Sequence, residues 1–459
     1  MLLRLTLANF LSFRDEVAFS MIATREKQHT DRVFADPERD LKVLPIAAVY
    51  GANGSGKSNF YRAIEFVRDL VLNSTQSPEE QIPVKPFRLD ESSERQASRF
   101  SFEILTGDKE IYRLTIAVTG RAVTEEKLEV VGASKYRLVY SRNAEASVYT
   151  WNFGQLHREG VPAEERDFIS FKARDTLPNQ LFISALRGRN VRQIESVVTW
   201  FRDGLQLMTP NTIFKQLEIS LQAVAGLRKY CVEALRKADT GISGLTRREV
   251  PLTAVPLPEQ FNADMDQFFR KVIPEGKAML MSGPDGHRFT LRHEADGLHA
   301  TRLLTQHRTK SGKDVEFYMA EESDGTQRFV DLLPAFYDLA HSAEGKVFVI
   351  DEIDRSLHTE LTRNLIDAFL QTLGTASRSQ LIFTTHDVML LDQDMLRRDE
   401  IWFTEKDEEG NSDLFGLSDF KGVRADKDIR KSYLLGRFGG MPRILGLPRP
   451  HHDASLTVE

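Results

Sequence analysis

A run of eight residues near the start of the chain has the composition and spacing of a phosphate-binding loop. It reads Gly51-Ala-Asn-Gly-Ser-Gly-Lys-Ser58. Glycines in this pattern let successive backbone N–H groups turn toward a phosphate, while Lys57 reaches the outer phosphate oxygens and the Ser58 hydroxyl ligates Mg²⁺. We therefore expect a nucleoside triphosphate and Mg²⁺ here. The residues expected to contact them are Gly51, Asn53, Gly54, Ser55, Gly56, Lys57, Ser58 and Asn59.

Two acidic residues follow a short apolar run much later in the chain. Residues 347–350 read Val-Phe-Val-Ile, which is typical of a buried strand, and Asp351 and Glu352 come directly after them. At the end of such a strand Asp351 would ligate Mg²⁺. Glu352 would lie opposite the γ-phosphate and orient the attacking water as a general base. An Asp-Glu pair is ordinarily an exposed turn, but a complete phosphate loop in the same chain favours the catalytic interpretation.

Two smaller features concern the same chemistry. The segment Ser323-Asp-Gly-Thr-Gln327 leads into a predicted helix, and a serine with a glycine at a helix start can cradle an anion. His386 follows the predicted strand 380–385, where it would reach a γ-phosphate. Each feature also has a plain structural interpretation, as a helix cap and as a core histidine. Their order and spacing make them candidates. The predicted catalytic residues are Glu352, Lys57 and His386.

The elements that must position these residues alternate between strands and helices. The phosphate loop lies between an apolar strand at 43–50 and a helix at 59–72. Short strand-like runs separated by turn signals fill 100–151 and predict an antiparallel lobe. Helical periodicity over 191–240 predicts a short helical insertion. We therefore expect an α/β fold, a P-loop NTPase head with an antiparallel β lobe and a helical insertion.

Length and composition bound the class of protein. The chain has 459 residues, which predicts two to three domains. Its net charge of −6 gives no overall basic field for nucleic acid, and Cys231, the single cysteine, excludes an intrachain disulfide. Without a signal peptide or a membrane-spanning run, we expect a cytoplasmic protein without membrane contact. The predicted division is 1–190 for the first half of the head, 191–250 for a helical arm, 251–447 for the second half and 448–459 for a flexible tail.

The order of these motifs resembles the ABC-type ATPase head. The opening Asn9-Phe-Leu-Ser-Phe-Arg14, ahead of the phosphate loop, is similar to the branch that contains RecF, SMC and OLD proteins. The resemblance implies that ATP is bound between two heads, as a homodimer or higher homo-oligomer. Ser323, Gly325 and Gln327 of one copy would then complete the site that Lys57, Ser58, Asp351 and Glu352 form in the other. Phe13 and Arg14 are candidates for contacts to the adenine.

Among these relatives the chain is most similar to stand-alone OLD-like ATPases of bacterial anti-phage systems, with the ATPase subunit of a PARIS-type system as the leading candidate. The segment after Asp392 lacks the carboxylate pattern of a Toprim nuclease domain. We therefore expect the effector, a Toprim-type or other nuclease, to be a separate protein encoded nearby, and the trigger to be a phage protein.

The alternative from another class is a RecF-like ATPase that processes DNA, with nucleic acid as its partner. Basic residues in two stretches would have to form one stripe for this role. These residues are Arg187, Arg189 and Arg192 in the first stretch, and Arg228, Lys229, Arg236 and Lys237 in the second. A scaffold that binds ATP without turnover is a third class, and the intact Glu352 argues against it.

Overall fold

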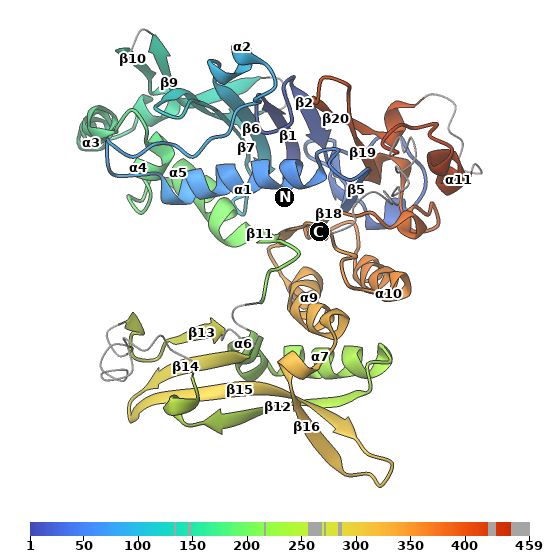
Figure 1. The fold of residues 1–459 in the computed structure, drawn as a ribbon. Coiled ribbons are helices and arrows are strands. Elements are labelled where there is room, and N and C mark those ends of the chain that lie inside the picture. The colour runs from blue at the N-terminus through green and yellow to red at the C-terminus, as the bar shows by residue number, and fades with distance from the viewer. Residues whose placement is uncertain are drawn as a thin grey trace, which may run out of the picture.

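A computed structural model describes residues 1–132, 135–145, 148–214, 217–255, 269, 272–282, 287–420 and 428–441. The predicted tail at 448–459 lies outside these residues. Three larger β-sheets and the helices between them form the molecule (Figure 1), and a small hairpin pairs β3 (Phe34–Asp36) with β4 (Leu41–Val43). None of the helices in the described part combines the length and the apolar composition that a membrane crossing requires.

The central sheet has six strands in the order β11-β17-β18-β5-β19-β20, and all neighbours are parallel except β19 and β20. Parallel strands covered on both faces have continuous apolar sequences, which explains the run that forms β17. The bounds are β11 (Leu205–Met208), β17 (Val347–Ile350), β18 (Gln380–Thr384), β5 (Ile46–Gly51), β19 (Ile401–Lys406) and β20 (Ser412–Gly416).

A second sheet of seven antiparallel strands has the order β10-β9-β8-β7-β6-β1-β2. It contains the runs between 100 and 151, so the predicted α/β fold with an antiparallel lobe is confirmed. The bounds are β1 (Leu2–Ala8), β2 (Val17–Ser20), β6 (Ser98–Leu105), β7 (Ile111–Val118), β8 (Val123–Val131), β9 (Tyr136–Glu145) and β10 (Val148–Asn152).

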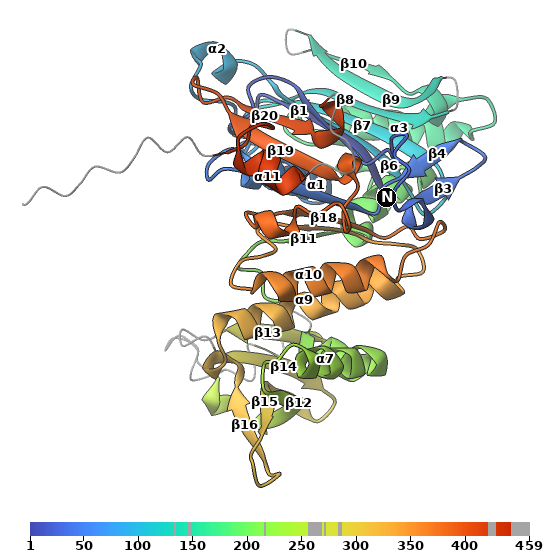
Figure 2. The ribbon, with the colours of Figure 1, turned by 90° about the vertical axis from the view of Figure 1, so that its right-hand side faces the viewer.

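The two faces of the central sheet border different cores. Along β5, Ala47 and Val49 pack with the antiparallel sheet and α1, whereas Ile46, Ala48 and Tyr50 pack with α9 and α10. Figure 2 shows the resulting layers, with α9 and α10 beneath the central sheet. The helices of these layers and their surroundings are α1 (Lys57–Asn73), α2 (Glu91–Glu94), α3 (Ala163–Asp175), α4 (Phe182–Ala185), α5 (Arg192–Thr199), α9 (Asp324–His341), α10 (Thr359–Leu370) and α11 (Ile429–Leu434).

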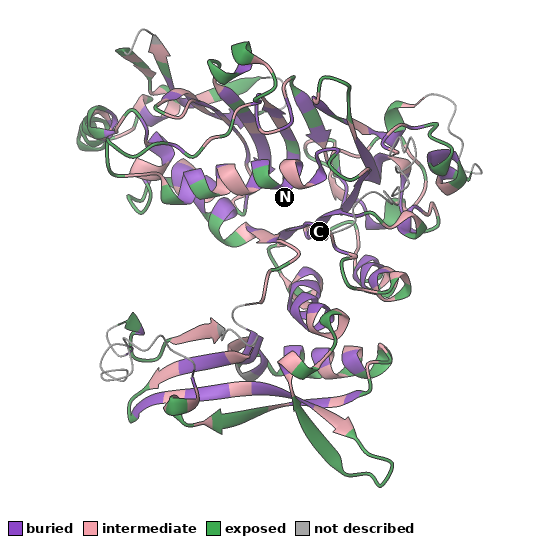
Figure 3. Cartoon of the chain, in the orientation of Figure 1, coloured by how far each residue is buried: buried purple, intermediate pink, exposed green. Residues whose placement is uncertain are grey.

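The third sheet and two helices form a second lobe on the far side of α9 (Figures 1 and 2). Its strand order is β12-β15-β14-β13, with β16 also paired to β15, and β16 is largely exposed (Figure 3). The elements of the second lobe are α6 (Leu217–Ala223), α7 (Ala225–Lys237), β12 (Ile242–Val250), β13 (Ala278–Ser282), β14 (Arg288–Glu294), β15 (Gly297–Arg308) and β16 (Asp314–Tyr318).

The range 191–250, expected to be a helical arm, is helical only in part. It contains α5, α6 and α7, and a π-helical turn at Trp200–Gly204 follows α5. It also contains β11, which joins the central sheet beside β17, and β12, an edge of the third sheet. A four-residue strand such as β11 is too short for sequence periodicity to separate it from the flanking helices. The division into domains stays a prediction.

Candidate functional site

The phosphate loop, residues 51–58, runs from the end of β5 into the first turn of α1, so its backbone N–H groups and the positive helix end share one direction. Gly56 has a φ of 122°, and a Cβ there would lie 2.7 Å from the Oγ atom of Ser412. The Oγ atom of Ser55 lies 2.6 Å from Oγ1 of Thr404. Side chains of β19 and β20 therefore hold the loop in its curved form, and only glycine fits at position 56.

Lys57 is buried at the base of this loop. Its Nζ atom donates hydrogen bonds to the carbonyl oxygens of Gly51, at 2.7 Å, and Ala52, at 3.0 Å. It also lies 3.4 Å from Nδ1 of His386. Burial lowers the pKa of Lys57 to about 8, against the opposing effect of nearby carboxylates, chiefly Asp351. Burial and the Lys57 ammonium likewise lower the pKa of His386. The structure thus brings two of the three predicted catalytic residues together.

Asp351 and Glu352 meet the end of β18 because β17 and β18 are parallel neighbours. The hydroxyl of Thr384, in β18, donates to Oδ1 of Asp351 at 2.6 Å and accepts from the backbone N–H of Glu352 at 2.8 Å. Glu352 has a φ of 48°, an uncommon conformation for a residue with a side chain, and one that often marks functional sites. Thr384 therefore fixes both acidic residues, a role that sequence analysis missed.

The loop after Glu352 is tied to the loop that carries His386. The backbone N–H of Ile353 donates to the carbonyl of Thr384 at 3.1 Å, and the N–H of His386 donates to the Asp354 carboxylate at 3.4 Å. The Arg355 guanidinium lies 3.9 Å from the Glu352 carboxylate. The two loops at the carboxyl end of β17 and β18 therefore form one unit beside the phosphate loop.

The segment 323–327 forms the start of α9. Ser323 is its N-cap, with Oγ accepting from the N–H of Thr326 at 3.1 Å. The side chain of Gln327 donates to the carbonyl of Glu322 at 3.0 Å. Within the described part of the chain, the side-chain hydrogen bonds of Ser323 and Gln327 stay within residues 322–327 and none reaches the phosphate loop. The structure therefore does not unite these residues with Lys57 in one copy of the chain.

Gly325 packs directly against the loop that follows Glu352. A Cβ at position 325 would lie 2.5 Å from the carbonyl oxygen of Ser356. Ser356 itself has a φ of 61°. The start of α9 and the loop after β17 are therefore in backbone contact, and position 325 has no room for a side chain.

The turn at 9–14 packs on the phosphate loop, and the Phe13 ring is buried in this contact. Phe13 is fully buried and faces Gly56, so its ring has no exposed surface for an adenine base and this expectation was wrong. Ser12 accepts a 2.8 Å hydrogen bond from the side chain of Asn59. Arg14 is paired with Glu409. The turn thus braces the first turn of α1.

A cleft of about 730 Å³ opens beside this turn. It borders Ser12 and Asn59, and its lining includes basic side chains, among them Arg62 and Arg88. Asn59 directly follows Ser58. The cleft therefore lies next to the α-phosphate end of any triphosphate that the loop holds.

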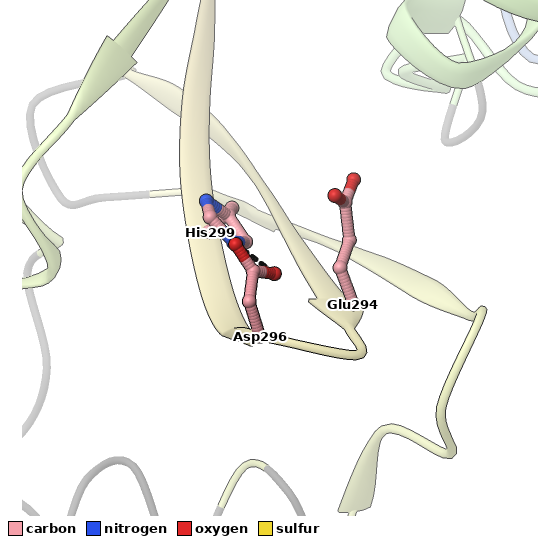
Figure 4. Close-up of side chains that lie close together, drawn as sticks. All are labelled: Glu294, Asp296 and His299. Carbon is pink, nitrogen blue, oxygen red and sulfur yellow. Dashed lines mark hydrogen bonds and ion pairs between the residues drawn. The ribbon is translucent and has the colours of Figure 1, made fainter.

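A cluster of possible metal ligands lies far from this site, on the β14–β15 hairpin (Figure 4). One ligand atom each from Glu294, Asp296 and His299 lie within 4.8 Å of one another. Both ring nitrogens of His299 are already engaged, with Glu249 at 2.8 Å and Asp296 at 2.9 Å. These two hydrogen bonds raise the pKa of His299 to about 9. In this structure Asp296 and Glu249 therefore form an ion-pair network around His299.

The basic residues of the DNA alternative lie in two separate places. The first stretch runs from the turn after α4 to the start of α5, and α4 packs on α1. The second belongs to α7, which packs on β12 and α9 (Figure 1). Within the second, Arg228 and Arg236 donate to the backbone carbonyls of Leu245 and Ser243 in β12. The residues therefore do not form the single stripe that this alternative requires.

Comparisons with solved structures give low similarity over most of the chain. The Smc head bound to the C-winged helix domain of ScpA is 15% identical, with 90% of this chain and 97% of that chain covered and a TM-score of 0.37. The SMC head domain from Thermotoga maritima is 13% identical, with coverage of 90% and 98% and a TM-score of 0.36. The recombination mediator protein RecF with ATP is 13% identical, with coverage of 90% and 97% and a TM-score of 0.36.

Comparison with protein families identifies the family of the chain. A search of curated proteins finds no significant match. One family model, described as "AAA domain, putative AbiEii toxin, Type IV TA system", matches residues 46–392. This match begins at β5, includes the phosphate loop, the acidic pair and His386, and covers most of the chain. The chain therefore belongs to this AAA-domain family.

Proposed function

We propose that this chain binds and hydrolyses ATP at the carboxyl edge of its central sheet. The observation that carries this proposal is the convergence of Lys57, His386 and the Asp351–Thr384–Glu352 hydrogen-bonded group beside a phosphate loop. Lys57 neutralises the outer phosphates. Glu352, held in a strained backbone conformation, orients the attacking water and accepts its proton. His386 lies beside Lys57 and contacts the γ-phosphate from the same side.

Ser58 and Asp351 are the residues that would hold Mg²⁺. Thr384 occupies only Oδ1 of Asp351, and no hydrogen bond from the described residues reaches the other carboxylate oxygen. A hydroxyl and a carboxylate are the hard oxygen ligands that Mg²⁺ prefers, so this donor set fits the ion. When bound, Mg²⁺ would supply charge neutralisation at the phosphate oxygens.

The cleft beside Asn59 is the best candidate for the nucleoside part of ATP. The residue after the loop serine lies next to the α-phosphate, so the ribose and base extend past Asn59 toward Arg62 and Arg88. Arg88 is exposed on the same wall and can stack on a base. This assignment replaces Phe13.

Two copies of the chain pair around the nucleotide. Support comes from the position of Ser323, Gly325 and Gln327, which lie at the start of α9 and, among the hydrogen bonds of the described residues, have none to the phosphate loop of their own chain. In a symmetric pair, this segment of one copy faces the phosphate loop of the other and supplies an N-terminal helix dipole to the γ-phosphate. Contact between Gly325 and Ser356 would transmit that pairing to the loop after Glu352.

We further propose that this ATPase is a switch in a bacterial anti-phage system, related to OLD-like ATPases of the PARIS type. The family description, a putative toxin of a toxin–antitoxin system, supports a role that controls toxicity. In this role a phage protein changes the ATP-dependent pairing, which releases or activates a separate effector such as a Toprim-type nuclease. Co-expression of the chain with the protein encoded beside it, followed by phage challenge, tests this role.

ATP hydrolysis by the purified chain tests the biochemical part directly. Lys57→Ala should lose nucleotide binding, whereas Glu352→Gln should bind ATP normally and hydrolyse it at least about 100-fold more slowly. Normal turnover by Glu352→Gln would show that another residue activates the water. Lack of nucleotide binding by the wild-type chain would refute the proposal as a whole.

A further inference from the structure

Two buried charged residues lie one turn apart on α9, just beyond the segment 323–327. Arg328 is 6% exposed and Asp331 is 4% exposed. Asp331 is fully paired, because both of its carboxylate oxygens accept 2.8 Å hydrogen bonds from Arg288 of β14. Its Oδ1 also accepts from the backbone N–H of Phe214. Asp331 thus fixes α9 to the second lobe and to the loop that leads into it.

Arg328 is paired less completely than Asp331. Its Nη1 atom donates to the carbonyl of Thr209 at 3.2 Å. Among the residues that the structure describes, Nε and Nη2 of Arg328 contact no acceptor. Buried guanidinium groups normally use most of their five N–H donors, so this arrangement is costly for the fold. Burial lowers the pKa of Arg328 accordingly, against the nearby carboxylates, chiefly Asp331.

The position of Thr209 connects Arg328 to the acidic pair. Thr209 directly follows β11, and the preceding residue, Met208, accepts a 2.8 Å hydrogen bond from the backbone N–H of Asp351. The Arg355 guanidinium repels that of Arg328, whereas the carboxylates of Asp351 and Glu352 attract it. Arg328 therefore already binds the backbone of residues 208–209, which in turn binds Asp351. Within the described residues, its two remaining donor atoms are free to bind the acidic pair.

We propose that Arg328 is a positioning residue for ATP hydrolysis, whose spare N–H donors bind the Asp351–Glu352 turn from the side of α9 when two copies of the chain pair. This inference rests on the proposed ATPase function. When α9 engages the nucleotide of a second copy, a small shift of its first turns moves Arg328 relative to this turn. Arg328 thereby aligns Glu352 only in the paired state, and the Asp331–Arg288 pair keeps the rest of α9 fixed to the second lobe.

The control is a second arginine with the same local chemistry at the opposite edge of the sheet. Arg378 donates from Nη2 to the carbonyl of Thr106 at 2.7 Å, and within the described part of the chain its Nε has no acceptor. Arg378 precedes the start of β18, whereas Thr384 ends that strand. Arg378 is half-buried, whereas Arg328 is buried. Arg378→Met therefore removes a guanidinium with a similar hydrogen-bonding arrangement without touching the acidic pair.

The test compares kcat, ATP dissociation constant and thermal midpoint for wild type, Arg328→Met, Arg328→Lys and Arg378→Met. We expect Arg328→Met to lower kcat at least about tenfold with ATP affinity changed less than about twofold. Arg328→Lys, which retains the charge with fewer donors, should recover part of the loss. Arg378→Met should keep both parameters at the wild-type values.

Several outcomes would overturn the inference. An unchanged kcat in Arg328→Met, or equal losses in Arg328→Met and Arg378→Met, would assign Arg328 to packing alone. If Arg328→Met does not fold, Arg328→Lys decides by the same measurements, and a kcat equal to wild type overturns the inference. Wild-type protein that binds no ATP, or binds it without turnover, would instead refute the proposed function, and the inference would fall with it.

Discussion

Thr384→Val isolates the hydrogen bonds that hold the acidic pair. The substitution keeps the shape of the side chain and removes its hydroxyl. Thr384 is buried, and its hydroxyl serves Oδ1 of Asp351 and the N–H of Glu352 at once. Without that hydroxyl, a buried carboxylate oxygen and a backbone donor both lose a partner, and Glu352 loses a restraint on its strained conformation.

The magnitude follows from the two bonds. A hydrogen bond to a charged group contributes about 1.5–3 kcal/mol and a neutral one about 1 kcal/mol, so the expected loss of unfolding free energy is about 2.5–4 kcal/mol. Misalignment of Glu352 should lower kcat about 10- to 100-fold. Lys57 and the phosphate loop do not contact this hydroxyl, so ATP affinity should change by less than about threefold.

Thr362→Val is the matched control. Thr362, in α10, is equally buried, and in the described part of the chain its hydroxyl has no partner. Removing that hydroxyl should leave stability the same or slightly higher and leave kcat unchanged. Urea unfolding and steady-state ATP hydrolysis measure both variants. Equal stability and equal kcat for Thr384→Val and Thr362→Val would refute the assignment of Thr384.

Two further predictions use the same site. Because Lys57 has a pKa of about 8, its ammonium loses its proton as the pH rises through that value. The affinity for ATP should therefore fall over this pH range. Lys57→Arg keeps its charge, so its ATP affinity should show no such fall. Calorimetric titration at several pH values checks this, and a flat profile in the wild type would contradict it. Gly325→Ala would place a Cβ 2.5 Å from the carbonyl of Ser356, so hydrolysis should fall at least about tenfold while ATP binding by single chains persists. Gly374→Ala, where a Cβ meets nothing within 4 Å, is the control, and equal rates for the two variants would argue against the contact.

The sequence predicts the parts of the site that are local in the chain. Residues 51–58 lie between the end of β5 and the first turn of α1. Their conformation is therefore determined largely by residues close in the sequence. The acidic pair is equally local, since it ends an apolar strand. The order β17-β18-β5 then brings it to the same edge as the loop, and parallel pairing explains this meeting.

Contacts between distant segments could not be predicted in this way. Thr404 reaches Ser55 across 349 positions, and Thr384 reaches Asp351 across 33 positions. Threonine at the end of a strand is too common to identify as a support for a carboxylate. The second lobe was also missed as a unit, because β12 pairs with β15, which lies far along the chain. Arg328 gave no signal, since only burial reveals its spare donors.

The central claim is that two copies each supply half of one ATP site. Lys57→Ala removes the phosphate-loop half, and Ser323→Arg removes the half at the start of α9, where Ser323 is exposed. Each variant alone should be inactive. In an equal mixture of the two variants, about half of the pairs contain one copy of each. Such a pair has one site with both halves intact and one site with neither. About a quarter of the wild-type ATPase rate should therefore return. No recovery at any mixing ratio or protein concentration would contradict the claim.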